Sequence, residues 1–178
     1  ASPGTRSSTV CDQRRASGLS LHIKPSCKLA RFFHPLLKVG NVSQPQRAVI
    51  LSAGQGSRLL PLTAQMPKCL LDLCGRSMLE WQLRGLSQMG VPEAVVVTGF
   101  HPELVEAELK RVAPQNMRVR TLYNPFYKLA DNLASCWMAR AELTGTCLIL
   151  NGDTLFEPDI AGRLIAAASA PITVTIDR

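Results

Sequence analysis

AVILSAGQGSRL, residues 48–59, is the stretch that decides the fold of this 178-residue chain. Its first four residues are apolar and indicate a buried strand, which runs directly into a turn that contains Gly54 and Gly56. Glycine has no Cβ, so the backbone N–H groups of such a turn can approach a bound anion closely. Arg58 and Lys68 add the positive charge that a polyphosphate requires. The stretch therefore predicts a site for a nucleoside triphosphate.

Two better-known phosphate-binding loops do not fit this turn. The P-loop ends in Gly-Lys followed by Ser or Thr, whereas Arg58-Leu59 stands where that ending would be sought. The dinucleotide-binding fingerprint needs a third glycine, and Leu59 occupies its place. The turn is thus expected to bind a triphosphate by a different arrangement.

From residue 47 onward, short apolar runs alternate with segments of helical periodicity. The expected strands are 48–51, 94–98, 118–122, 147–150 and 172–176, with 69–73 as a weaker candidate. Helices are expected from Ser77, which forms a capping-box pattern with Glu80, to Gly90, and around 103–112, 132–142 and 159–168. This alternation predicts an α/β fold: a three-layer, Rossmann-like, mostly parallel sheet with helices on both faces.

Ligands of such sheets bind beyond the carboxyl ends of the strands, where the strand order switches. The glycine turn and Asn151-Gly152-Asp153 each follow an apolar strand, so both are expected at that edge. A carboxylate at Asp153 can hold Mg²⁺ while phosphate oxygens complete the coordination, or it can simply cap the turn. Glu157 and Asp159 are expected to be acids at the start of a helix.

Several short motifs together resemble the sugar-phosphate and choline-phosphate nucleotidyltransferases, over residues 47–178. The matching segments are Ala53-Gly54-Gln55-Gly56-Ser57-Arg58-Leu59, Pro61-Leu62-Thr63, Pro67-Lys68, Gly99-Phe100, Asn124, Asn132-Leu133-Ala134-Ser135 and Asn151-Gly152-Asp153. The resemblance is greatest to the choline-phosphate cytidylyltransferase branch. It implies the fold of the nucleotide-diphospho-sugar transferases and a Mg²⁺-dependent transfer of a nucleotidyl group.

The phosphate groups have three expected partners. Gly54, Gly56 and Ser57 would donate backbone N–H groups to the triphosphate, and Arg58 would bind its β- and γ-phosphates. The resemblance puts Lys68 at the reacting phosphates, where its compact ammonium touches the α-phosphate and the attacking phosphate. The alternatives are an ordinary turn and two solvated surface cations.

The expected partners of the base and ribose lie in two other segments. The resemblance puts Asn132 and Ser135 near the base or ribose, although Asp131 or Asn132 could equally be a helix N-cap. Gly99 would give close backbone approach near the base, or simply turn the chain. The residues expected to bind the nucleotide are Leu51, Ala53, Gly54, Gly56, Ser57, Arg58, Gly99, Asn132 and Ser135. Phe100 and Trp137 are expected in the core.

The expected reaction joins a small phosphomonoester such as phosphocholine to the nucleotidyl group of an NTP, with CTP favoured, and releases pyrophosphate. A sugar 1-phosphate acceptor with CTP, UTP or dTTP is the alternative. The resembled family continues beyond the point matched by residue 178, with an acceptor-binding part and a second metal-binding carboxylate. A truncated, non-catalytic nucleotide-binding module is therefore the third reading.

Charge is distributed unevenly along the chain, whose net charge is +7. Residues 1–46 hold seven Lys or Arg and a single acid, Asp12, whereas residues 47–178 are nearly neutral. We interpret residues 1–46 as a basic, disordered leader and residues 47–178 as the nucleotide-binding domain. Because the globular part is nearly neutral, no nucleic-acid partner is expected.

Neither the cysteines nor the apolar runs suggest a secreted or membrane protein. The six cysteines show no Cys-x-x-Cys spacing, and four fall in apolar runs where a reduced thiol is a small hydrophobe. No apolar run approaches the roughly 20 residues that a membrane-spanning helix needs. A cytoplasmic location is the simplest expectation.

Overall fold

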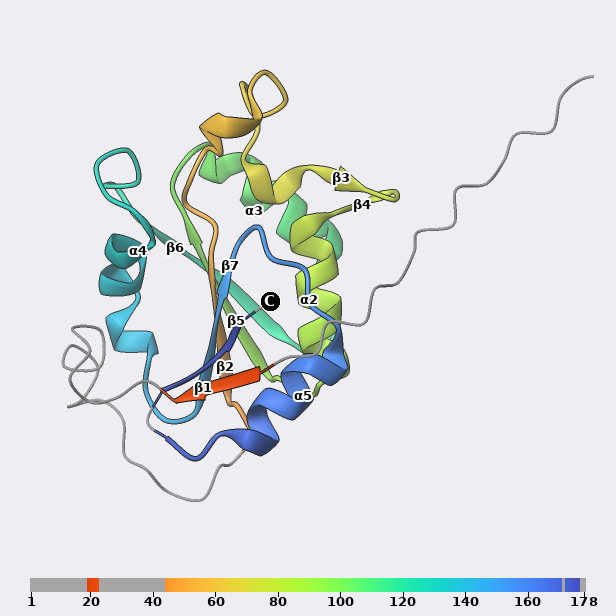
Figure 1. Cartoon of the computed structure of the whole chain (residues 1–178). Coiled ribbons are helices and arrows are strands. Elements are labelled where there is room, and N and C mark those ends of the chain that lie inside the picture. Colours follow the sequence, from red (N-terminus) through yellow and green to blue (C-terminus); the bar gives the residue numbers. More distant parts are fainter. Residues whose placement is uncertain (1–18, 23–43, 171, 177–178) are drawn as a thin grey trace, which may run out of the picture.

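The computed structural model describes residues 19–22, 44–170 and 172–176. Its centre is a parallel sheet with the strand order β6-β5-β2-β7 (Figure 1). The four strands are β2 (Arg47–Leu51), β5 (Glu93–Thr98), β6 (Arg118–Tyr123) and β7 (Cys147–Asn151). Each of them lies within one residue of an expected strand at either end.

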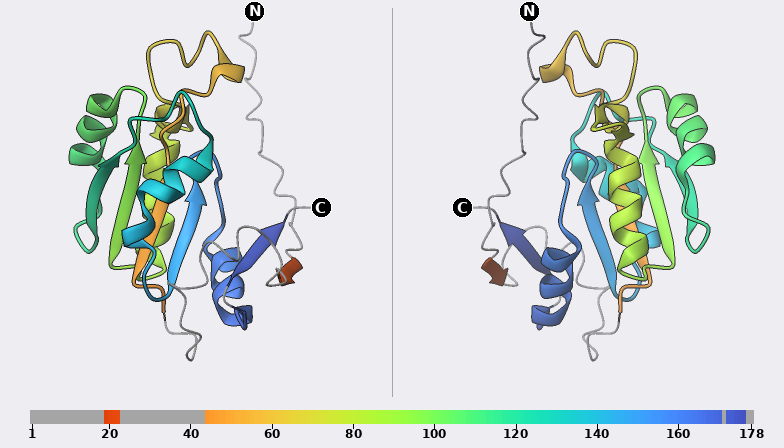
Figure 2. Two further views of the ribbon diagram at one scale, coloured as in Figure 1. Left: turned by 90° about the vertical axis from the view of Figure 1, so that its left-hand side faces the viewer. Right: turned by 90° about the vertical axis from the view of Figure 1, so that its right-hand side faces the viewer.

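The central strands are apolar along their length because both faces of the sheet are covered. Ala48 and Ile50 of β2 belong to one hydrophobic cluster, and Val49 and Leu51 belong to another on the opposite face. Helices α2 (Met78–Gln88) and α3 (Pro102–Val112) pack on the first face. Helix α4 (Asn132–Met138) and the 3₁₀ helix η3 (Arg140–Glu142) lie on the second (Figure 2). The expected three-layer α/β fold is confirmed.

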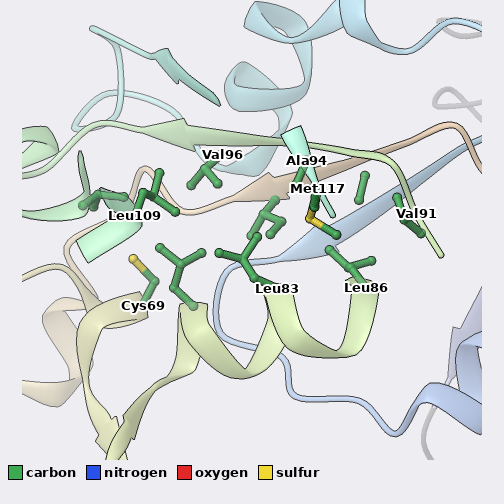
Figure 3. Packing of buried hydrophobic residues seen from close by; sticks show 12 residues of the cluster. Cys69, Leu83, Leu86, Val91, Ala94, Val96, Leu109 and Met117 are labelled. Carbon is green, nitrogen blue, oxygen red and sulfur yellow. The ribbon is translucent and has the colours of Figure 1, made fainter. Parts of the chain in front are cut away.

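Helix α2 supplies most of the contacts on the first face. Leu79, Leu83 and Leu86 are fully buried in one cluster with Ala94, Val96 and Met117. Leu83 and Leu86 project from α2 towards the sheet (Figure 3). The expected N-terminal cap is present, since Ser77 Oγ accepts a hydrogen bond from Glu80 N at 3.0 Å. The helix ends at Gln88, and Gly90 follows the C-cap residue Met89 with a φ of 75°, which glycine adopts at little cost.

Two expected elements differ in the structure. Most of the weak strand candidate 69–73 is wrong: Lys68–Leu70 forms a 3₁₀ helix, η2, and only Asp72–Leu73 forms a strand, β3. Strand β3 pairs with β4 (Arg76–Ser77) in a short hairpin. The third expected helix, 132–142, is interrupted at Ala139, where α4 gives way to η3. The fourth is present as α5 (Pro158–Ala167).

The last expected strand lies outside the parallel sheet. Strand β8 (Thr173–Ile176) pairs antiparallel with β1 (Leu19–His22) in a separate two-stranded sheet. Strand β1 lies within residues 1–46, which we expected to be a disordered leader. Its backbone pairs with β8, and the sequence pattern did not indicate this partner. The remainder of that leader, apart from 44–46, lies outside the described residues.

The topology places the site. From β2 the chain moves outward to β5 and β6, and then returns to the other side of β2 to form β7. The strand order therefore switches between β2 and β7, and the loops that follow these two strands share one edge of the sheet. Within the described residues, no helix combines the length and apolar character needed to cross a membrane.

Candidate active site

A pocket of about 500 Å³ opens at the carboxyl ends of β2 and β7. Its volume lies within the range that small-molecule sites occupy. Its lining combines the glycine turn, the start of η2, the segment before α4 and the turn after β7. The lining residues are Leu51, Ser52, Gly54, Gln55, Gly56, Ser57, Arg58, Leu59, Lys68, Cys69, Tyr127, Lys128, Asn132, Gly152 and Asp153.

Lys68 and Asp153, two predicted site residues, meet in this pocket. Lys68 Nζ donates a hydrogen bond to Asp153 Oδ2 at 2.7 Å. The side chains are 30% and 45% exposed respectively, so solvent and a ligand can reach both. This contact differs from the alternative in which Asp153 caps its own turn. It supplies one ammonium and one carboxylate at a single point of the pocket.

The glycine turn packs against the aliphatic part of the Lys68 side chain. Gly56 has a φ of 79°, and a Cβ at this position would lie 2.9 Å from Lys68 Cβ. Glycine is thus needed at position 56 both for its backbone conformation and for this close approach. Thr63, which is fully buried, closes the turn by donating from Oγ1 to Gly56 O at 2.8 Å. The turn and the lysine stem therefore form one packed unit.

The backbone N–H groups of this turn are available for a ligand. Within the described residues, the N–H groups of Gly54, Gly56 and Ser57 donate to no other atom. Successive free N–H groups in a glycine-containing turn form an anion-binding concavity. These three N–H groups therefore remain free to donate to a bound anion.

Two further cations line the pocket. Arg58 and Lys128 have no ion-pair partner among the residues that the structure describes, and the ammonium of Lys128 lies 5.8 Å from the centre of the Tyr127 ring. Together with Lys68 they give the pocket lining three positive charges, against the one negative charge of Asp153. The pocket is thus electropositive, as a polyphosphate requires. Sequence reasoning missed Lys128, whose only signal was its position beside Tyr127.

Asn132 lines the pocket as predicted. It is the first residue of α4, whereas Asp131 holds the N-cap position and makes no side-chain cap hydrogen bond. Asn132 Nδ2 donates instead to Asn151 Oδ1 at 2.9 Å. Of the two expected N-cap candidates, Asp131 holds the N-cap position and Asn132 does not.

Three predicted nucleotide-binding residues do not line the pocket. Ser135 is buried, and its Oγ accepts from Asn124 Nδ2 at 3.1 Å. Ala53 accepts a hydrogen bond from Phe100 N through its carbonyl. A Cβ on Gly99 would lie 2.6 Å from Ala53 O and 2.5 Å from Tyr127 Cβ. Gly99 therefore permits close packing of the β5 loop against neighbouring loops.

The aromatic residues near the site differ in burial. Tyr127 packs against the second hydrophobic cluster and also lines the pocket. Trp137 was expected in the core, but its side chain is 48% exposed and the Arg140 guanidinium lies 4.7 Å from its ring centre. That expectation is wrong because Trp137 occupies the outward face of the short helix α4. Phe100 is partly buried, beside His101.

The turn after β7 presents Asp153 under tight steric constraint. Gly152 N donates to Leu51 O, and a Cβ on Gly152 would lie 2.6 Å from that oxygen and also contact Ser52 Oγ. Beyond the turn, Glu157 is the N-cap residue of α5 and Asp159 lies in its first turn, as expected. The turn therefore directs one carboxylate, Asp153, into the pocket.

The donor set around Asp153 fits a magnesium ion that is shared with phosphates. In the described part of the chain, no cluster of three or more His, Cys, Asp or Glu forms a complete metal cage. Mg²⁺ is commonly held by one or two carboxylates together with substrate phosphates. The exposed carboxylate of Asp153 beside the phosphate-binding turn meets that requirement.

Cys69 lines the pocket, but its thiol is expected to be unreactive. It is buried, and desolvation raises the pKa of its thiol to about 11. A thiol that stays protonated is a poor nucleophile and a poor metal ligand. Its position next to Lys68 therefore serves packing and does not add a second reactive group.

Residues 48–177 match the family model of the MobA-like NTP transferase domain. Over 126 residues the chain is 39% identical to the CMP-5'-(3-aminopropyl)phosphonate synthase of Streptomyces rubellomurinus, covering 71% of this chain and 20% of that protein. It is 31% identical to the N-acetylmuramate alpha-1-phosphate uridylyltransferase of Neisseria meningitidis, covering 70% of this chain and 54% of that protein.

A solved structure agrees with the fold. The CTP:phosphocholine cytidylyltransferase of Streptococcus pneumoniae superposes with a TM-score of 0.54 at 25% identity, covering 64% of this chain and 49% of that one. The present chain thus spans from a fifth to about half of the lengths of these three proteins. The residues matched by the family model, 48–177, contain the glycine turn, Lys68 and the turn of Asp153.

Proposed function

The chain belongs to the family of MobA-like NTP transferase domains, a family of nucleotidyltransferases, and we propose that it transfers a nucleotidyl group from CTP to a small phosphomonoester such as phosphocholine. An acceptor phosphate oxygen attacks the α-phosphorus, a new P–O bond forms, and the bond to the β-phosphate oxygen breaks. Pyrophosphate leaves in line with the attack. No covalent enzyme intermediate is needed.

One observation carries this proposal: the glycine turn, Lys68 and Asp153 converge on one pocket, with Lys68 Nζ 2.7 Å from Asp153 Oδ2. Phosphoryl chemistry of this kind depends on positioning and on neutralising charge rather than on a protein nucleophile. A cation, a carboxylate and free backbone N–H groups at a single point supply both.

Each residue has a role that follows from its chemistry. The N–H groups of Gly54, Gly56 and Ser57 cradle the triphosphate, and the planar fork of Arg58 binds the β- and γ-phosphates of the leaving group. Lys68 bridges the α-phosphate and the attacking phosphate, because an ammonium can serve two crowded oxygens from one point. Asn132, with both donor and acceptor atoms, binds the base or ribose.

Asp153 would hold Mg²⁺, which when bound neutralises phosphate charge. In the chain without ligands, Lys68 supplies the positive charge beside this carboxylate. Because a divalent ion held by Asp153 would repel the neighbouring ammonium, we expect Lys68 Nζ to contact phosphate oxygens in the nucleotide complex.

Two similarities support CTP as the donor. The enzyme of Streptomyces rubellomurinus is named a synthase of a CMP conjugate, and the structural relative is named a CTP:phosphocholine cytidylyltransferase. The uridylyltransferase of Neisseria meningitidis supports the alternative of a sugar 1-phosphate with UTP. A non-catalytic nucleotide-binding module is the remaining alternative.

A pyrophosphate-release assay on this chain separates the three. Release with CTP and phosphocholine, exceeding release with UTP and a hexose 1-phosphate, supports the cytidylyl proposal. Tighter binding of UTP or dTTP than of CTP by calorimetry would overturn it in favour of the sugar branch. Magnesium-dependent nucleotide binding without release, for every acceptor offered, would favour the binding module.

A further inference from the structure

Gln82 is a polar side chain in an apolar stripe. Helix α2 buries Leu79, Leu83 and Leu86 against the sheet, and Gln82 lies on the same face with 1% of its surface exposed. Periodicity predicts an apolar residue at such a position. A buried amide there costs free energy unless its polar atoms are hydrogen-bonded. Its contacts therefore need a specific explanation.

The amide nitrogen of Gln82 holds both ends of the turn that carries Asp153. Gln82 Nε2 donates to Asn151 O at 2.7 Å and to Thr154 O at 2.8 Å. Because both neighbours are carbonyl oxygens, the amide orientation is fixed, with its NH₂ group towards the turn. Asp153 lies between these two anchor points, although 69 and 72 residues of chain separate Gln82 from them.

The other half of the amide shows that packing alone does not account for this residue. Gln82 Oε1 is buried and has no hydrogen-bond partner among the described residues. An unpaired buried oxygen is unfavourable, and an apolar side chain of similar shape would avoid it. The residue is thus suited to fixing the turn and poorly suited to filling the core.

Two helices on opposite faces of the sheet hold this turn together. Gln82 of α2 binds its backbone carbonyls, and Asn132 of α4 donates to Asn151 Oδ1. The turn itself is otherwise solvent-facing, since Asn151, Asp153 and Thr154 are exposed. Because the residues that carry these carbonyls are themselves exposed, the turn can shift to hydrate its carbonyls when Gln82 is replaced, so the replacement would affect the geometry of the turn more than the stability of the fold.

We propose that Gln82 is a positioning residue that fixes the Asn151–Thr154 turn and thereby sets the affinity of Asp153 for a divalent cation. The inference rests on the proposed function, because the cation is the one that the nucleotide brings. Residues that orient a metal ligand typically change metal affinity by about 10-fold or more when they are replaced.

The test compares Gln82→Met with Gln88→Met. Both changes replace the amide by an unbranched apolar side chain on α2, but Gln88 is exposed and lies at the end of the helix. Mn²⁺ binding in the presence of CTP is measured by electron paramagnetic resonance, and amide hydrogen exchange is measured over residues 151–155. We expect Gln82→Met to weaken Mn²⁺ binding by about 10-fold and to speed exchange in the turn. Gln88→Met should leave both unchanged.

Two results overturn the inference. Unchanged exchange and Mn²⁺ affinity in Gln82→Met would show that Gln82 does not position the turn. Faster exchange across the whole domain, with a matching fall in melting temperature, would show that it only stabilises the core. If the wild-type chain binds neither Mn²⁺ nor CTP, the proposed function itself is wrong. The hydrogen-exchange rates of the two variants would still show whether Gln82 fixes the turn.

Discussion

Lys68 Nζ and Asp153 Oδ2 lie 2.7 Å apart although 85 residues separate them in the chain. The parallel pairing of β2 with β7 brings them together, since the loops that follow these neighbouring strands emerge at the same edge of the sheet. Both side chains remain partly exposed, so the pair costs little to open. We interpret it as a site for exchanging one cation for another.

Removal of either partner should abolish chemistry and spare the fold. We expect Lys68→Ala and Asp153→Ala each to lower turnover by about 100-fold or more, because each loses a group that stabilises charge at the reacting phosphates. The free energy of unfolding should change by only about 1 kcal/mol or less, as for other exposed ion pairs. Steady-state kinetics and chemical denaturation provide the two measurements.

Arg84→Ala is the control for that pair, since the exposed Arg84 also forms an ion pair, with the buried Glu80 on α2, but lies outside the pocket. It should retain full turnover. Wild-type turnover in Lys68→Ala or Asp153→Ala would remove that residue from the proposed mechanism.

Substitution of Gly152 tests whether the close packing of its turn against Leu51 and Ser52 is needed. A Cβ in Gly152→Ala would press on Leu51 O and Ser52 Oγ, so the turn must shift. We expect the unfolding free energy to fall by about 1–3 kcal/mol and nucleotide affinity to fall with it. Gly162→Ala, in α5 with open space around its Cβ, should instead be neutral or stabilising. Equal stabilities of the two variants, measured by urea denaturation, would contradict this steric account.

Glu93 predicts a pH dependence of stability. Hydrogen bonds from Arg120 Nε at 2.8 Å and Arg47 Nε at 2.7 Å lower the pKa of Glu93 below its ordinary value of 4.5. The folded chain thus binds this proton less tightly than the unfolded chain, so the stabilisation is present above pH 4.5 and is lost as the pH falls through the lowered pKa.

Glu93→Gln should therefore destabilise the chain by about 1–3 kcal/mol at neutral pH, and the difference from wild type should shrink in acid. Glu106→Gln, which changes an exposed carboxylate on α3, provides the comparison. Urea denaturation between pH 3 and pH 7 measures both. A difference that stays constant over this range would exclude the proposed linkage.

The cysteines should differ in reactivity. Desolvation raises the pKa of Cys69 to about 11, whereas Cys74 is exposed in the β3–β4 hairpin. At pH 8 a thiol reagent should label Cys74 and leave Cys69 unmodified until the chain unfolds. Because the folded chain retains the Cys69 proton, its stability should also fall as the pH rises from about 9 towards 11. Peptide mapping that finds both labelled at equal rates would contradict the burial.

The fold was predictable where covered strands leave a clear pattern. β2 and β5 are apolar on both faces because helices cover both, and Ser77 and Gly90 mark the ends of α2. The pairing of β1 with β8 was not predictable, because antiparallel pairing of two short strands so far apart depends on tertiary proximity. Similarly, nothing local indicated that 132–142 would divide at Ala139.

The site was most predictable where its residues directly follow strands, as the glycine turn and Asp153 do. Lys68 and Asn132, which lie further along the loops, also line the pocket, and short motifs indicated them. Ser135 could not be assigned from sequence because its burial depends on Asn124, on another element. The role of Gln82 could not be predicted from the sequence for the same reason. Its hydrogen-bond partners lie on β7 and in the turn that follows, whereas the pattern of its own helix predicts only packing.

The most direct measurement is anomalous diffraction from crystals of the chain with Mn²⁺ and CTP. We predict a manganese peak coordinated by the carboxylate of Asp153, phosphates against the N–H groups of Gly54 and Gly56, and Lys68 Nζ moved from Asp153 onto a phosphate oxygen. A triphosphate bound away from the glycine turn, or a manganese ion elsewhere with the pair of Lys68 and Asp153 intact, would contradict the account.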